Sequence, residues 1–188
     1  MQQLPAKAAL ISIDVQQAFD HPSWGRRNNP EAERNIGALL DGWRATGRPL
    51  FHIQHRSPRP ASLFHPDQPT YRHKPEGQPL PGETVIFKRV NSSFIGTDLE
   101  ARLRAAGIEV LVIVGLTTDH CVSTTTRMAG NFGFETYFVG DATATFERTG
   151  PDGRHYTAGQ MHDTALASLH GEFATVVTTR EVLEALGA

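Results

Sequence analysis

VLVIVGLTTDHCVSTTT, residues 110–126, combines a strand pattern, a turn and a helix pattern. The apolar run 110–114 is rich in β-branched residues and ends at Gly115, which predicts a buried strand. A short polar turn then leads to Cys121, the single cysteine of the chain, and the pattern from Val122 onward predicts a helix. Ligands of an open parallel sheet bind beyond the carboxyl ends of its strands, and a helix N-terminus favours a thiolate over a thiol. This position therefore suits a nucleophile, although a lone cysteine is more often an inert apolar residue.

Strand patterns and helix patterns alternate along the whole chain. Strands are expected at 8–13, 49–53, 84–87, 108–114, 134–139 and 173–177, and helices at 30–46, 97–106, 122–131, 157–170 and from 178 onward. This alternation favours parallel strands, because right-handed crossovers place the connecting helices on both faces of the sheet. The length of 188 residues fits one domain with a substantial core. We therefore expect a single α/β domain over residues 1–188, with three α/β/α layers and a six-stranded, mainly parallel sheet.

Three helix starts carry capping signals in the sequence. Asn29 is expected to cap the helix that follows it, because a short polar side chain accepts hydrogen bonds from the first free backbone N–H groups. Thr97 with Glu100 has the spacing of a capping box, and Thr178 with Glu181 repeats that spacing before the last helix. These three positions therefore predict where the helices begin.

Composition and charge limit the class of protein. The formal net charge is −2, which gives no electrostatic footprint for nucleic acid. One cysteine excludes an internal disulfide framework and suits a reducing compartment. Residues 1–7 lack the pattern of a signal peptide, and no apolar run approaches the roughly 20 residues that a membrane span needs. We expect a cytoplasmic protein whose partner is a small-molecule substrate, with neither nucleic acid nor membrane.

Three reactive side chains follow the carboxyl ends of three predicted strands. They are Asp14, Lys88 and Cys121. Parallel strands place their carboxyl ends at one edge of the sheet, so these side chains can converge. In such a trio the cysteine attacks a carbonyl carbon, the aspartate takes and later returns the proton, and the lysine supplies a positive charge. His120 is a poor base for the neighbouring cysteine, because residues i and i+1 diverge on a helix.

Several motifs in a fixed order resemble one family of enzymes. They are Asp14, Gln16 and Phe19; Phe87 and Lys88 followed by Asn91, Ser93 and Phe94; T-x-L-x-x-x-L-x-x-x-G-I over 97–108; G-x-x-T-x-x-C-V over 115–122; and D-A-T-A-T over 141–145. Over nearly its whole length the chain resembles the isochorismatase-like cysteine hydrolases, the superfamily of nicotinamidase, N-carbamoylsarcosine amidase and ureidoacrylate hydrolase. Each motif alone is weak evidence, but their order and spacing together are specific.

The resemblance implies roles for several residues. It implies Asp14, Lys88 and Cys121 as a catalytic triad, and an oxyanion hole formed by the backbone amides of Thr117 and Cys121. It also implies a six-stranded sheet and a cis peptide bond between Leu116 and Thr117. Members of this family are commonly dimers or tetramers, so the resemblance implies a homodimer or a homotetramer.

The chain departs from the metal-binding pattern of the nicotinamidases. Those enzymes carry a D-W-H-P-x-x-H motif after the second strand, whereas residues 54–58 here read QHRSP, without the aspartate. His52 and His55 could still bind a metal, but a structural or surface role is the more frequent one for such histidines. We therefore predict no metal and no other cofactor. The cysteine favours cleavage of a carbon–nitrogen bond over vinyl-ether hydrolysis.

Side chains near the reactive trio are candidates for a substrate pocket. The candidates for apolar walls are Phe19, Trp24 and Phe94, and those for polar contacts are Gln54, His55 and Asn91. Ordinary core packing is the alternative for each aromatic side chain. Four arginines in the loops after the first two strands either bind a carboxylate or are solvated; they are Arg26, Arg27, Arg56 and Arg59. The aperiodic segment 54–82 either covers the site or packs on a neighbouring subunit.

These residues support one leading hypothesis and three alternatives. The leading hypothesis is a metal-independent cysteine amidohydrolase that cleaves an amide, carbamoyl or lactam bond through a thioester on Cys121. The second is a vinyl-ether hydrolase of the isochorismatase type. The third is a non-catalytic binding or scaffold protein of the same fold, which the presence of all three reactive groups disfavours. The fourth is a redox-sensing thiol, because an accessible thiolate is also oxidisable.

Overall fold

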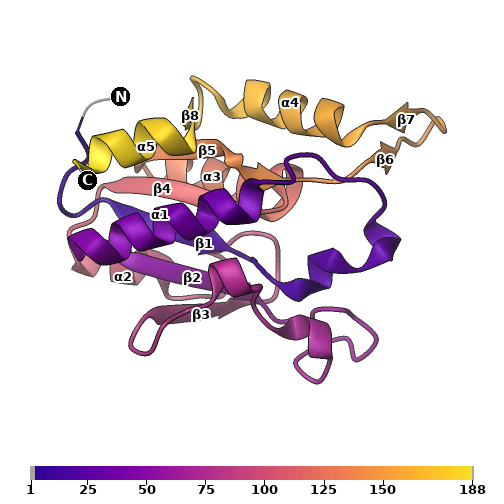
Figure 1. Ribbon diagram of the computed structural model, residues 1–188, viewed down its shortest axis with the longest axis horizontal. Helices are drawn as coiled ribbons and strands as arrows, with labels where there is room; N and C mark the ends of the chain where they lie inside the picture. Colours follow the sequence, from indigo (N-terminus) through magenta and orange to yellow (C-terminus); the bar gives the residue numbers. More distant parts are fainter. Residues whose placement is uncertain (1–2, 188) are drawn as a thin grey trace.

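In the computed structural model, which describes residues 3–187, six parallel strands form the centre of the molecule (Figure 1). They are β1 (Ala9–Ile13), β2 (Leu50–His55), β3 (Thr84–Lys88), β4 (Val110–Leu116), β5 (Glu135–Ala144) and β8 (Thr175–Val177). Their order in the sheet is β3-β2-β1-β4-β5-β8, and each neighbouring pair is parallel. The predicted six-stranded parallel sheet is confirmed. The ends of the predicted domain, residues 1, 2 and 188, lie outside the described residues.

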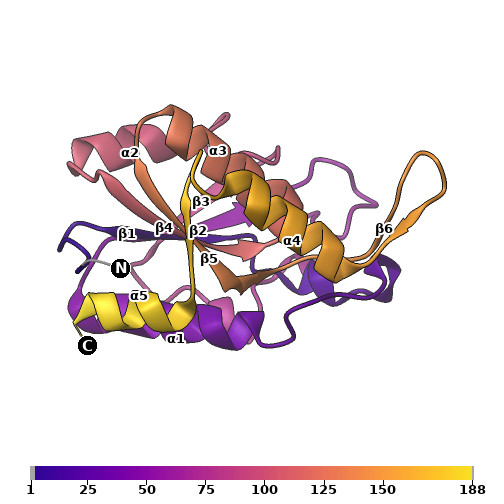
Figure 2. The same ribbon diagram turned by 90° about the horizontal axis from the view of Figure 1, so that it is seen from above.

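Helices cover both faces of the sheet, as Figure 2 shows. One face carries α1 (Ala32–Thr46) and α5 (Thr179–Leu186). The other face carries α2 (Leu99–Ala105), α3 (Ser123–Asn131) and α4 (Ala158–Leu169). The predicted three-layer α/β/α architecture is therefore confirmed, and the strand order explains it, because the helices α1 to α4 lie in crossovers between parallel strands.

Strand β4 lies at the centre of the core, and its residues are all buried. Successive side chains of a strand point to opposite faces of the sheet. Ile11 and Ile113 therefore belong to the apolar cluster that includes Leu103 of α2, whereas Val112 belongs to the cluster that includes Trp43 of α1. A strand that is buried on both faces has a continuous apolar run instead of alternation. Such runs are the reason why the strands could be predicted.

The capping box predicted before α5 is present. The side chain of Thr178 accepts a hydrogen bond from the Glu181 N–H, and the Glu181 carboxylate accepts one from the Thr178 N–H. A second capping box, which the sequence analysis did not identify, begins α4 and consists of Thr157 and Gln160. Two of the first free N–H groups are satisfied in each helix.

Of the other two capping predictions, the cap at Asn29 is wrong and the capping box at Thr97 is only half formed. The side-chain amide of Asn29 donates to the carbonyl oxygens of Gly140 at 3.2 Å and Thr143 at 2.8 Å. It thereby ties the loop before α1 to the end of β5, and α1 begins later than predicted. Thr97 donates its hydroxyl to the carbonyl oxygen of Ser93 at 2.6 Å and accepts a hydrogen bond from the Leu99 N–H at 3.4 Å. The predicted box is incomplete, because the Glu100 carboxylate pairs with Arg104 instead of the Thr97 N–H.

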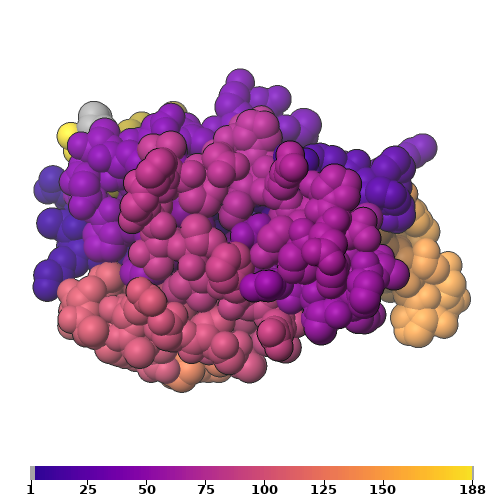
Figure 3. Space-filling model, turned by 90° about the horizontal axis from the view of Figure 1, so that it is seen from below, coloured from indigo at the N-terminus to yellow at the C-terminus, as the bar shows by residue number. Residues whose placement is uncertain are grey.

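The segment between β2 and β3 is irregular and contains two short 3₁₀ turns, Pro69–Tyr71 and Pro75–Gly77. It spreads over the side of the molecule next to β3, where Figure 3 shows it in magenta. The hairpin of β6 (Arg148–Thr149) and β7 (His155–Tyr156) projects from the body of the molecule (Figures 2 and 3). Within residues 3–187, no helix has the length and apolar character that would let it cross a membrane.

Replacing Gly115 with alanine is expected to destabilise the fold by about 3 to 5 kcal/mol. Gly115 has φ +127°, and a Cβ atom there would lie 2.0 Å from the carbonyl oxygen of Ile13 on β1. Urea unfolding followed by circular dichroism measures the change. The control is Gly159→Ala in α4, where the nearest atom would be 3.9 Å away, so its stability should stay within about 1 kcal/mol of wild type. A Gly115→Ala protein as stable as the control would contradict the prediction.

Candidate active site

Three side chains meet where β1, β3 and β4 end. Asp14 directly follows β1, Lys88 ends β3, and Cys121 lies in the turn between β4 and α3. Because β2 separates β1 from β3, the long lysine side chain is needed to reach the carboxylate. Lys88 Nζ donates hydrogen bonds to Asp14 Oδ2 at 2.5 Å and to the backbone oxygen of Val90 at 3.2 Å. The structure thus brings the predicted trio together, with both members of the ion pair fully buried.

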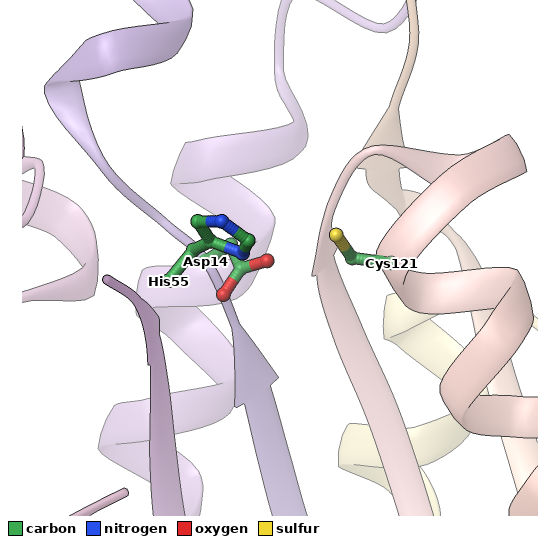
Figure 4. A group of neighbouring side chains, drawn as sticks. All are labelled: Asp14, His55 and Cys121. Atoms are coloured by element: carbon green, nitrogen blue, oxygen red, sulfur yellow. The ribbon is translucent and has the colours of Figure 1, made fainter. Parts of the chain in front are cut away.

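The second oxygen of Asp14 is an open acceptor. Among residues 3–187, the buried Oδ1 of Asp14 has no hydrogen-bond partner. The sulfur of Cys121 faces the carboxylate (Figure 4), and potential ligand atoms of Asp14, His55 and Cys121 lie within 4.8 Å of one another. The side-chain amide of Asn91 donates to Cys121 Sγ at 3.6 Å. The sulfur therefore has a proton acceptor nearby and a hydrogen-bond donor that holds it in place.

Burial and the neighbouring carboxylate keep the Cys121 thiol protonated. Burial has the largest effect, Asp14 adds to it, and Lys88 opposes it in part, which together raise the pKa of Cys121 to about 12. The expectation that the helix N-terminus favours a thiolate is therefore wrong for the resting site. Burial disfavours the charged form of Lys88, but the charge of Asp14, 2.5 Å from the ammonium group, outweighs this effect and raises the lysine pKa. The resting site holds a thiol, a carboxylate and an ammonium group.

The turn after β4 gives the nucleophile its position. The Leu116–Thr117 peptide bond is cis, and residues Thr118–Val122 form a π-helical turn that leads into α3. Thr117 and Cys121, whose backbone amides are predicted to form the oxyanion hole, both line the same pocket. From α4, the buried His162 supports this turn, because its Nδ1 lies 2.9 Å from Thr118 Oγ1. The sequence analysis did not identify His162, which lies 44 residues from its partner.

A pocket of about 240 Å³ opens beside the trio. Its lining residues are Asp14, Phe19, Trp24, His55, Arg59, Ser62, Phe64, Asn91, Thr117, His120 and Cys121. Four of the six predicted pocket residues are therefore in place: Phe19, Trp24, His55 and Asn91. The aromatic rings form a tight group, since the centroid of Phe19 lies 5.1 Å from that of Trp24 and 5.0 Å from that of Phe64. The pocket thus has room for a small molecule with a flat, apolar part.

Two predicted pocket residues lie elsewhere. The side-chain amide of Gln54 donates to the backbone oxygen of Tyr71 at 2.9 Å, so Gln54 holds the irregular segment against the sheet. The ring of Phe94 packs against Phe132 and Phe134, at centroid distances of 5.2 and 6.3 Å, in the core beneath α2 and α3. The alternative of ordinary core packing is therefore correct for Phe94.

The irregular segment supplies pocket residues that sequence reasoning missed. Ser62 and Phe64 come from it, and Arg59, which the sequence analysis named only as one of four loop arginines, also lines the pocket. Phe64 was the available signal, because a large apolar residue in a polar loop usually packs against something. The segment therefore covers part of the site, as one of the two predicted alternatives states.

The charges at the site bear on the prediction that no metal binds. His52 is buried, and its Nε2 lies 2.8 Å from the carboxylate of Glu83, which makes it a structural residue. His55 lies close to Asp14 and to the sulfur, and these three side chains are of metal-binding types. However, Lys88 Nζ lies 2.5 Å from Asp14 Oδ2 and 3.4 Å from His55 Nδ1. A metal ion there would be repelled by the ammonium group, which supports a metal-independent site.

Known proteins resemble this chain over most of its length. The family model described as the Isochorismatase domain matches residues 8–181. The isochorismatase family protein YrdC of Bacillus subtilis is 50% identical over 177 residues, which cover 94% of this chain and 95% of that protein. Nicotinamidase 3 of Arabidopsis thaliana is 26% identical over 183 residues, which cover 90% of this chain and 84% of that protein. A crystal structure of an isochorismatase-family protein from Chromobacterium violaceum has a TM-score of 0.97 and 48% identity, and the match covers 100% of this chain and 97% of that one.

Proposed function

Because the chain belongs to the isochorismatase family of hydrolases, we propose that it is a cysteine hydrolase that cleaves a carbon–nitrogen bond of a small molecule. The bond is an amide, carbamoyl or lactam bond. One observation carries the proposal: the Cys121 sulfur faces the carboxylate of Asp14, whose Oδ1 is free while Oδ2 is bound to Lys88. A nucleophile, a base and a fixed cation in one pocket are the groups that acyl transfer requires. Similarity to a nicotinamidase supports an amide as the reacting group.

In the acylation half of the reaction, Cys121 Sγ attacks the carbonyl carbon as its proton moves to Asp14 Oδ1. The backbone amides of Thr117 and Cys121 stabilise the developing oxyanion. Asp14 then transfers the proton to the leaving nitrogen, the carbon–nitrogen bond breaks, and an amine or ammonia departs. The acyl group remains on the sulfur as a thioester. Lys88 holds the carboxylate in place throughout.

In the deacylation half, Asp14 acts again as a general base, now toward water. Water attacks the thioester carbonyl while its proton moves to Asp14. The carbon–sulfur bond then breaks, the sulfur regains the proton, and a carboxylic acid is released. One carboxylate thus serves as base and acid in both halves, which explains why a single acceptor oxygen beside the sulfur is sufficient.

The alternatives have weaker support. The family match favours a vinyl-ether hydrolase as the second candidate, but that reaction has no need of a thiol nucleophile. A scaffold protein would gain nothing from a buried ion pair next to a thiol, because such pairs contribute little to stability. A redox sensor needs an accessible thiolate, whereas Cys121 is 9% exposed and its pKa is raised to about 12.

A substrate panel tests the proposal. The purified protein is incubated with primary amides, N-carbamoyl compounds, small lactams and isochorismate, and the products are identified by ammonia assay and mass spectrometry. We expect turnover of at least one compound with a carbon–nitrogen bond. Turnover of isochorismate alone would establish the second candidate in its place. A homodimer or homotetramer remains a prediction, which light scattering during size-exclusion chromatography tests.

A further inference from the structure

We propose that Arg59 selects substrates that carry a carboxylate next to a flat apolar group, with the carboxylate bound at the mouth of the catalytic pocket. This inference rests on the proposed function in one respect only, namely that the pocket beside Cys121 binds the substrate. Arg59 lies in the irregular segment after β2, and it lines that pocket together with Asp14 and Cys121.

Contacts distinguish Arg59 from the other three loop arginines. The guanidinium of Arg27 donates to both carboxylate oxygens of Glu33, at 2.7 and 2.9 Å, so its charge is compensated. Arg56 lies over the ring of Phe87, at 5.7 Å from the centroid, and lines a separate groove. Arg26 does not line the catalytic pocket. Among residues 3–187, no carboxylate lies within ion-pair distance of Arg59, which is exposed and free to bind a ligand.

The charge balance of the pocket also favours an anion. Asp14 and Lys88 neutralise each other at 2.5 Å, and the thiol of Cys121 is protonated. Burial has the largest effect on His55 and lowers its pKa; Asp14 opposes this, while the charges of Lys88 and Arg59 add to it, so the ring is neutral at pH 7. His55 and Arg59 line the same pocket. No negative charge in the pocket therefore compensates the positive charge of Arg59.

The position of Arg59 in the fold fits a substrate with two functional groups. Cys121 follows β4 and Arg59 follows β2, and β1 lies between these strands. The two chain segments therefore leave the sheet about 10 Å apart. Phe19, Trp24 and Phe64 line the space between them. A ligand with its reacting carbonyl at the sulfur, a ring against the aromatic walls and a carboxylate at the guanidinium fills this arrangement.

Matched pairs of probes test the assignment. The anionic probes are 3- and 4-carbamoylbenzoate, and the neutral probes are the corresponding benzene dicarboxamides, which have almost the same shape. Dissociation constants are measured by calorimetry on Cys121→Ala, where no turnover occurs, and kcat/KM is measured by ammonia release on the enzyme with Cys121. We expect at least one anion to be preferred over its diamide, and Arg59→Gln to reduce that preference about five- to tenfold.

Two further variants make the result specific. Arg59→Lys should retain part of the preference, because the charge remains while the bidentate geometry is lost. Arg56→Gln should not change the preference, because Arg56 lies outside the catalytic pocket. Sodium chloride should weaken binding of the anion to the protein with Arg59 and have less effect on Arg59→Gln.

The outcomes separate this inference from the proposed function. One outcome is that the protein prefers the anionic probes in an Arg59-dependent way but hydrolyses no amide. This result would refute the carbon–nitrogen hydrolase and still support the carboxylate site. Hydrolysis of amides with equal preference for anion and diamide would refute the carboxylate site alone. Failure of every anionic probe to bind, or an equal effect of Arg59→Gln on both members of each pair, would also overturn the assignment.

Discussion

Replacing Cys121 with alanine is expected to reduce turnover of the identified substrate by at least about 10⁴-fold. The sulfur forms the covalent bond in the proposed mechanism, and no other nucleophilic side chain among residues 3–187 occupies its position beside the Asp14 carboxylate. Alanine removes one polar atom from a buried site, and it adds no bulk. The loss should therefore be one of chemistry, with the fold retained.

Three measurements separate a chemical loss from a structural one. Near-ultraviolet circular dichroism and thermal unfolding should show that Cys121→Ala is folded. Calorimetry should show that it still binds substrate. Mass spectrometry of the wild-type protein, quenched in acid during turnover, should show the mass of the acyl group on the peptide that contains Cys121. Retained turnover in the alanine variant would exclude the thiol mechanism.

The sequence was sufficient to place the trio because of the geometry of parallel sheets. Asp14, Lys88 and Cys121 each follow an apolar run, and parallel strands put such positions on one edge. The apolar runs themselves are clear because β1 and β4 are buried on both faces. Local patterns therefore carried enough information for the architecture and for the positions of the three reactive side chains.

The pocket could not be predicted to the same extent, because long-range contacts form it. The ring of Phe64 packs against Phe19, which lies 45 positions earlier in the sequence. Phe64 belongs to a segment without periodicity, so no local pattern predicts this contact. The protonation state of Cys121 depends on burial and on the charges of Asp14 and Lys88, which follow or end other strands. The helix terminus alone therefore predicted a lowered pKa for the thiol, whereas its pKa is raised. Asn29 failed as a predicted helix cap for a related reason, since its amide binds carbonyl oxygens that lie more than a hundred residues away.

Replacing Asp14 with asparagine is expected to have two opposite effects, a loss of turnover and a gain in thiol reactivity. Asparagine cannot accept the thiol proton, so turnover should fall by about 10³-fold or more. The negative charge of the carboxylate raises the pKa of Cys121, while the positive charge of Lys88 lowers it. In Asp14→Asn the lysine remains and the carboxylate charge is gone, so the thiol pKa falls and more thiolate is present at a given pH.

Iodoacetamide labelling measures the second effect, and the single cysteine makes the signal unambiguous. In the wild-type protein the pKa of Cys121 is raised to about 12, so the labelling rate should rise about tenfold per pH unit from pH 7 to pH 10 without reaching a plateau. In Asp14→Asn the rate at pH 8 should be about tenfold higher or more. The matched control is Asp20→Asn, which removes a carboxylate that pairs with Lys74 away from the sulfur and should leave labelling unchanged.

The combination of results distinguishes a general base from a purely structural aspartate. A purely structural Asp14, one that paired with Lys88 and had no effect on the sulfur, could be replaced without any change in thiol reactivity, because burial alone would then keep the pKa of Cys121 high. Unchanged labelling in a folded Asp14→Asn protein would therefore contradict the proposed role. The buried ammonium group loses its partner in this variant, which is expected to cost about 3 to 5 kcal/mol of stability. If that loss prevents folding, the pH profile of labelling in the wild-type protein still tests the role of Asp14. A plateau of the labelling rate near pH 8 would show an activated thiolate that needs no base.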